Sequence, residues 1–187
     1  MNLKSLLLFT GILLLTSNTF LTHLSTISEN VGKSKVLLPK YSFLNSKDET
    51  CLECEDFISN ALNKYTIPTI NKEFQHFLTC SRESVVNRHD SSVIDTVYTF
   101  SNPSNKIQIY RANQQDFIFV FDVTDSVFNL SGNVRPGMKK EAFLQKFHLT
   151  GIVNDKVKIF NSEGSMGFVF YFTNNRLKRI NSYLYLD

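Results

Sequence analysis

The sequence has few of the residues that mark specialised protein classes. Among 187 residues it has no Trp, 7 Gly, 4 Pro and 3 Cys. This scarcity excludes a collagen-like or mucin-like chain, and a hydrophobic content of 42% excludes a wholly disordered one. The length suits one domain of about 100 to 200 residues.

The sequence also lacks the short motifs of common enzyme classes. It contains no HExxH, no GxSxG, no P-loop and no GxGxxG. Its three cysteines have no nearby histidine, so they do not match a zinc site of standard spacing. A net charge of +3 gives little attraction for nucleic acid. We therefore expect no cofactor, no metal and no nucleic-acid partner.

The N-terminus predicts export. Lys4 is the only charged residue of the first 25, and the apolar run 5–15 follows it. A basic start and an apolar run of about 7 to 15 residues are typical of a secretory signal peptide. We predict a signal peptide at 1–25 and a periplasmic or secreted protein. The alternative is an uncleaved membrane anchor that extends through Phe20, Leu21 and Leu24.

Charge divides the remaining chain unevenly. Residues 26–130 carry 10 Lys+Arg and 13 Asp+Glu, whereas residues 131–187 carry 9 and 4. Such a run is usually a solvated face. The alternative interpretation is a basic C-terminal lobe that meets an anionic partner or a membrane surface.

The pattern of apolar residues predicts an α+β domain at 49–187 after a linker at 26–48. Thr50 and Glu53 have the spacing of a capping box, and apolar residues recur every three or four positions from Cys51 to Tyr65. We predict helices at 51–65, 70–79 and 136–147, the first two as an antiparallel pair. Strands are expected at 93–100, 106–110, 116–123, 156–160, 167–173 and 176–186, with a further one at 127–130.

Part of the sequence is repeated. Residues 106–110 resemble 156–160, residues 117–121 resemble 168–172, and a Pro-led helix precedes each pair. The alternative is convergent strand composition. We predict a tandem duplication, with repeat one at about 67–130 and repeat two at about 131–187.

The second repeat carries a family resemblance. Residues 137–143 (GMKKEAF) and 168–180 (FVFYFTNNRLKRI) resemble the repeat unit of β-lactamase-inhibitor-protein-like domains, and they are similar to the small lipoproteins of outer-membrane assembly. The resemblance implies a helical pair packed on one face of an antiparallel sheet. It also implies an exported domain that binds proteins and does not catalyse a reaction.

The last hairpin predicts two unlike sheet faces. If Asn174 and Asn175 form its turn, Tyr171 pairs with Lys178, and a bulge near 178–179 brings Leu177 and Ile180 to the core face. The other face then interleaves tyrosine with lysine. It is either an ordinary amphipathic sheet surface or a protein-binding surface, because tyrosine offers large contact area. The predicted partner-binding residues are Tyr171, Tyr183, Tyr185, Lys158 and Lys178.

The cysteines allow three interpretations. An antiparallel helical pair would place Cys54 opposite Cys80, which predicts a disulfide between them and leaves Cys51 free or exchanging with it. The alternatives are reduced core cysteines and a redox pair at Cys51 and Cys54.

Three functions follow from these patterns. The first is an exported protein-binding domain that uses the Tyr/Lys face. The second is a thiol oxidoreductase that uses Cys51 and Cys54. The third is a carrier of a small apolar ligand, held in a pocket between helices and sheet.

Overall fold

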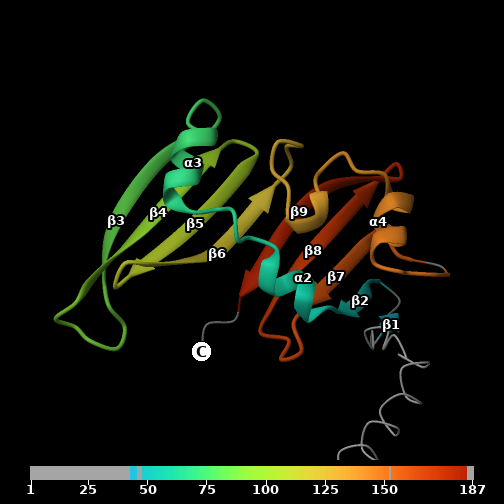
Figure 1. Cartoon of the computed structure of the whole chain (residues 1–187), viewed down its shortest axis with the longest axis horizontal. Coiled ribbons are helices and arrows are strands. Elements are labelled where there is room, and N and C mark those ends of the chain that lie inside the picture. Colours follow the sequence, from blue (N-terminus) through green and yellow to red (C-terminus); the bar gives the residue numbers. More distant parts are fainter. Residues whose placement is uncertain (1–42, 46–47, 152, 185–187) are drawn as a thin grey trace, which may run out of the picture. The chain divides into compact units, whose positions relative to one another are not determined.

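The fold is seen in a computed structural model that describes residues 43–45, 48–151 and 153–184. Within these residues nine strands form one sheet, in the order β1-β2-β7-β8-β9-β6-β5-β4-β3 (Figure 1). Neighbouring strands are antiparallel, except that β2 and β7 are parallel. The strands are β1 (Phe43–Asn45), β2 (Thr50–Glu53), β3 (Thr79–Val86), β4 (Ile94–Asn102), β5 (Asn105–Ala112), β6 (Gln115–Val123), β7 (Lys156–Phe160), β8 (Met166–Thr173) and β9 (Arg176–Leu184).

Three short α-helices occur in the described part of the chain: α2 (Glu55–Asn60), α3 (Ile67–Glu73) and α4 (Lys140–Lys146). All three lie on the same face of the sheet, which we call the inner face (Figure 1). None of them has the length and apolar character that a membrane crossing needs. The predicted signal peptide and most of the predicted linker lie outside the described residues.

The predicted fold class is wrong. A helical pair packed on an antiparallel sheet is replaced by a large mixed sheet with three short, separate helices. The predicted helix at 51–65 fails at its start, because Thr50 begins strand β2 and pairs with Val157 of β7. Thr50 and Leu52 are buried while Cys51 and Glu53 are half-buried, which is the alternation of a strand. Only residues 55–60 of that segment are helical.

Most of the predicted strands are confirmed. The strands predicted at 106–110, 116–123 and 156–160 appear as β5, β6 and β7, and those at 93–100, 167–173 and 176–186 appear as β4, β8 and β9 within a few residues. Residues 127–130 form no strand, although Leu130 makes an isolated bridge with Val134. Strand β3 was not predicted. A helix followed by antiparallel strands occurs twice, as α3 with β3–β6 and α4 with β7–β9, and the duplication itself stays a prediction.

The β8–β9 hairpin has the predicted turn. Asn174 and Asn175 both adopt positive φ, at 51° and 57°. Asparagine tolerates this conformation better than most residues, which explains the sharp reversal here. Phe172 pairs with Leu177 as expected, but the register then shifts and Tyr171 pairs with Arg179. The bulge therefore lies at Lys178, and the predicted pairing of Tyr171 with Lys178 is wrong.

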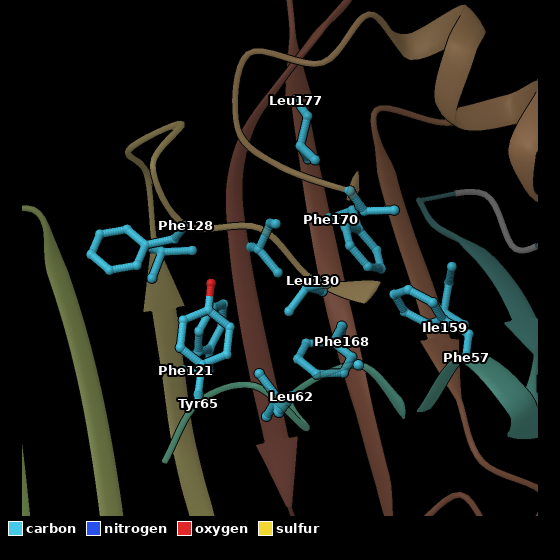
Figure 2. Packing of buried hydrophobic residues seen from close by; sticks show 14 of the residues in the cluster. Phe57, Leu62, Tyr65, Phe121, Phe128, Leu130, Ile159, Phe168, Phe170 and Leu177 are labelled. Atoms are coloured by element: carbon cyan, nitrogen blue, oxygen red, sulfur yellow. The ribbon is translucent and has the colours of Figure 1, made fainter. Parts of the chain in front are cut away.

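Aromatic rings fill the space between the helices and the inner face (Figure 2). Phe57 of α2 and Phe143 of α4 both contact Phe170 of β8, with ring centroids 6.2 and 4.8 Å apart. Tyr65 lies against Phe121 at 4.9 Å, and its hydroxyl donates to the Asn129 carbonyl and accepts from the Asn129 amide. The core is thus continuous from β5 and β6 to β7, β8 and β9.

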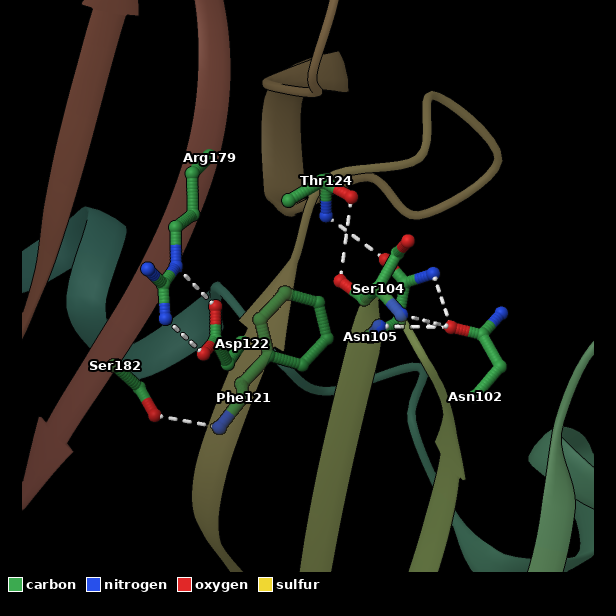
Figure 3. A network of polar contacts seen from close by, with 8 residues as sticks. All are labelled: Asn102, Ser104, Asn105, Phe121, Asp122, Thr124, Arg179 and Ser182. Atoms are coloured by element: carbon green, nitrogen blue, oxygen red, sulfur yellow. Dashed lines mark hydrogen bonds and ion pairs between the residues drawn. The ribbon is translucent and has the colours of Figure 1, made fainter.

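The strands that follow α3 (β3–β6) and the strands that follow α4 (β7–β9) meet at a short junction between β6 and β9. Strands β6 and β9 pair only at Asp122–Asn181 and Val123–Ile180. Side chains extend this contact, because Arg179 forms two hydrogen bonds with the Asp122 carboxylate and Ser182 Oγ accepts the Phe121 amide at 2.7 Å (Figure 3). The Ser182 hydroxyl therefore substitutes for a backbone carbonyl where the strands begin to diverge.

Replacing Ser182 by alanine should weaken this junction. The buried Phe121 residue would lose the partner of its amide, and we expect the free energy of unfolding to fall by about 1 kcal/mol. Hydrogen exchange at the Phe121 amide, read by NMR, should accelerate at least tenfold. The matched variant Ser182→Thr keeps a hydroxyl and should exchange at nearly the wild-type rate. Equal protection in the wild type and the alanine variant would show that this bond is not maintained.

Candidate functional site: the outer face of β7, β8 and β9

The sheet has a second face that no helix of the described residues covers, and we call it the outer face. Along β8, Phe168, Phe170 and Phe172 are buried against the helices, so the alternating Val169 and Tyr171 point the other way. Cross-strand pairing brings Lys158 beside Val169 and Lys156 beside Tyr171. The candidate site is this outer surface of β7, β8 and β9.

Tyr171 is the exposed aromatic residue of the site. Its side chain remains 37% exposed, between Lys156 on β7 and Arg179 on β9. Each neighbour is held by a carboxylate: Lys156 Nζ lies 2.9 Å from Glu49 Oε2, and Arg179 binds Asp122. These hydrogen bonds raise the pKa of Lys156 and of Arg179, so both stay charged at neutral pH. The phenol is therefore framed by two cations in fixed positions.

Tyr183 has a different role from Tyr171. It lies opposite Gly167, where a Cβ atom would be only 2.6 Å from Tyr183 Oη and 2.5 Å from the Ile159 carbonyl oxygen. The Tyr183 ring thus covers the glycine, as aromatic residues often do in sheets. Lys158 Nζ lies 4.3 Å from the centre of that ring, which is a cation–π contact. Tyr183 and Lys158 belong to the site, but Tyr183 also has a structural role, because its ring packs over the glycine of β8.

The remaining predicted residues are placed less favourably. Lys178 is exposed at the bulge and does not pair with Tyr171. Tyr185 lies outside the described residues. Sequence reasoning missed Arg179 and Asp122, because the position of the bulge decides which basic residue faces Tyr171. The signal that could have found them is their opposite charge, since Asp122 lies in β6, the last strand of β3–β6, and Arg179 lies in β9, the last strand of β7–β9.

The predicted Cys54–Cys80 disulfide is not formed, and all three cysteines are free thiols. Cys51 lies in β2, Cys54 precedes α2, and Cys80 lies in β3 on the opposite edge strand of the sheet. The pairing depended on a helical hairpin that the fold does not contain.

The cysteines also offer little for thiol chemistry. Burial raises the pKa of both the Cys51 and the Cys54 thiol, and nearby carboxylates raise each further. A raised pKa reduces the thiolate fraction at neutral pH, and the thiolate is the reactive form. Among residues 43–45, 48–151 and 153–184, no group of three or more His, Cys, Asp and Glu side chains is placed to hold a metal ion.

Comparisons with known proteins identify no relative. No family model matches the chain, and searches of curated proteins and of solved structures found no match. The resemblance to β-lactamase-inhibitor-protein-like domains and outer-membrane-assembly lipoproteins therefore rests on residues 137–143 and 168–180 alone.

Proposed function

We propose that this chain is an exported, non-enzymatic domain that binds a protein partner through the outer face of β7, β8 and β9. The observation that carries the proposal is the exposed Tyr171 ring between Lys156 and Arg179, on a sheet face that no helix of the described chain covers. Interfaces are enriched in tyrosine and arginine, and a few such residues supply most of the binding energy. Export is proposed from the apolar run at 5–15.

The chemistry of the face indicates the kind of partner surface. Tyr171 offers an apolar ring with a hydroxyl. Lys156 and Arg179 flank it with positive charge, and Lys158 lies beside Val169, the next outward-facing residue of β8. Two of these cations already have carboxylate partners, so the local field is only moderately positive. A partner with an apolar centre and a few carboxylates at its rim would match it. In such an interface the ring supplies affinity and the rim charges supply orientation and association rate.

The double variant Tyr171→Ala/Lys158→Gln tests this proposal. Partners should first be captured by crosslinking the full-length protein in its native compartment, and the dominant one should then be measured by calorimetry. We expect the dissociation constant to rise about 10- to 100-fold, because central aromatic residues typically contribute about 1 to 3 kcal/mol. Tyr183 is kept in this variant, since its loss would also uncover Gly167.

A matched control separates this effect from general surface change. Phe77 follows α3 and is 53% exposed, and Lys72 is exposed on α3 itself. The variant Phe77→Ala/Lys72→Gln also removes one exposed ring and one ammonium group, yet it should bind the partner as the wild type does. If both double variants lose binding equally, or if neither does, the outer face of β7–β9 is not the binding surface.

A further inference from the structure

A cavity of about 680 Å³ lies at the end of the sheet where β3 and β5 end and β6 begins. Its walls are apolar and come from β5, β6 and β9, with Tyr110, Ala112, Phe117, Phe119 and Leu184 contributing. In Figure 1 this is the end of the sheet at which β9 also terminates. A volume in the range of about 300 to 1,000 Å³ is typical of sites for small molecules.

The topology explains why this space is not filled. Strands β6 and β9 pair at Asp122 and Val123, near the end of β6. The earlier part of β6 does not pair with β9 and diverges from the end of that strand. Phe119 is the extra residue of a bulge in β6, because Val120 pairs with Gln108 and Ile118 with Ile109. The Phe117 side chain remains 49% exposed although it borders an apolar hollow. An exposed aromatic wall of this kind favours an apolar ligand.

The buried Asp95 carboxylate binds both the Tyr110 wall of the cavity and the loop that follows β3. Asp95 is 3% exposed and accepts hydrogen bonds from the Tyr110 hydroxyl and from Asn87 Nδ2, the latter at 2.6 Å. Asn87 Oδ1 in turn accepts the backbone amides of His89 at 2.8 Å and Asp90 at 3.0 Å. The bond to Asp95 raises the pKa of Tyr110, which keeps its hydroxyl protonated as a donor. The Tyr110 wall and the loop at 87–90 are therefore joined through the same carboxylate.

The rim of the cavity carries positive charge. Arg88 and His89 line it from the loop after β3, and both are exposed. The next residue, Asp90, directs its carboxylate to the amide and hydroxyl of Ser92, at 2.9 and 2.6 Å. Asp95 is occupied by the two donors described above. Arginine stays charged at any physiological pH, so the rim complements an anion.

We propose that this cavity binds a small amphipathic anion, with its apolar body between Tyr110, Phe117 and Leu184 and its acidic group at Arg88. One alternative from the sequence was a pocket for a small apolar ligand between helices and sheet, whereas this cavity lies at the end of the sheet. It is also separate from the Tyr171 surface, so the proposal is independent of partner binding.

Two fluorescent probes of nearly the same shape test the proposal on the full-length protein. One is 8-anilinonaphthalene-1-sulfonate, and the other is N-phenyl-1-naphthylamine, which lacks the sulfonate. Both should bind, and the sulfonate should bind about tenfold more tightly because of its charge-assisted hydrogen bond. Amide chemical shifts should change at 86–89, 110–112 and 117–119. Equal binding of the two probes, no binding, or shift changes confined to other residues would each overturn the proposal.

Variants assign the two parts of the site. Arg88→Gln should reduce the preference for the sulfonate to less than twofold, whereas the matched Arg82→Gln, on the same hairpin but outside the cavity lining, should preserve it. Ala112→Phe should fill the cavity and weaken both probes at least tenfold, and Phe117→Ala provides the same readout if the larger side chain prevents folding. The Tyr171→Ala variant should bind both probes with the wild-type affinity, because Tyr171 does not line this cavity. That result would distinguish the cavity from the proposed partner surface.

Discussion

Replacing Phe143 by alanine should lower the free energy of unfolding by about 3 to 5 kcal/mol. Phe143 is fully buried on α4, and its ring centre lies 4.7 Å from Phe147, 4.8 Å from Phe170 and 5.0 Å from Phe172. Removal of this ring leaves a cavity that three neighbouring rings cannot fill. Small domains have a total stability of about 5 to 15 kcal/mol, so the loss is a large fraction of it. Urea denaturation followed by circular dichroism measures the change.

The variant Phe77→Ala is the control for this measurement. It removes the same ring from a position that is 53% exposed, so the free energy of unfolding should change by no more than about 0.5 kcal/mol. A loss below about 1.5 kcal/mol in Phe143→Ala would mean that α4 is not firmly packed on the sheet. That result would contradict the arrangement of aromatic rings on the inner face.

Replacing Gly167 by alanine should cost about 2 to 3 kcal/mol, because a side chain does not fit between β7 and the Tyr183 ring. The new Cβ atom would lie 2.5 Å from the Ile159 carbonyl oxygen and 2.6 Å from Tyr183 Oη. The ring can rotate away, but the carbonyl belongs to a paired strand and can move only if β7 and β8 separate. Thermal and urea unfolding of the variant measure the cost.

A double-mutant cycle with Tyr183→Ala divides this cost into its two sources. Removal of the ring relieves one of the two close contacts, so the double variant should be more stable than the sum of the two single changes implies. The contact with Ile159 remains, so the double variant should still be less stable than Tyr183→Ala alone. Strict additivity would show that the Tyr183 ring does not lie over Gly167.

The second half of the domain could be predicted well from the sequence. Asn174 and Asn175 mark a tight turn, and the strict alternation of phenylalanine in 168–172 fixes which face is buried. The interval between Leu177 and Ile180 requires a bulge, and one occurs. These signals are local, so they do not depend on distant parts of the chain.

Between residues 50 and 86 the prediction failed for identifiable physical reasons. The apolar residues from Cys51 to Tyr65 have helical spacing, but they are divided between strand β2, helix α2 and the turns after it. Pairing with β7, which local sequence cannot reveal, makes 50–53 a strand. Strand β3 escaped prediction because it is an edge strand with exposed side chains along nearly all of its length, so no face carries an apolar pattern.

The candidate site was predictable only in part. Alternation along β8 is enough to place Tyr171 on the outer face, and its exposure agrees with that expectation. The structural role of Tyr183 depends on Gly167, a residue 16 positions away that only the register of β8 and β9 brings opposite it. The apolar cavity could not be predicted from the sequence, since its lining comes from the β3–β4 hairpin, the β5–β6 hairpin and the end of β9.

The parallel pairing of β2 with β7 has a consequence for how the chain folds. Strands β3, β4 and β5 each pair with the next strand in sequence, so they need only short loops to close. By contrast, the Glu55 carboxylate accepts hydrogen bonds from Ser162, which is 107 residues away. During synthesis, residues 50–53 can pair with β1 on one side, but their other side has no partner strand until β7 has emerged. Closing so long a loop is entropically costly, so we expect the union of β2 with β7 to be the late and slow step of folding.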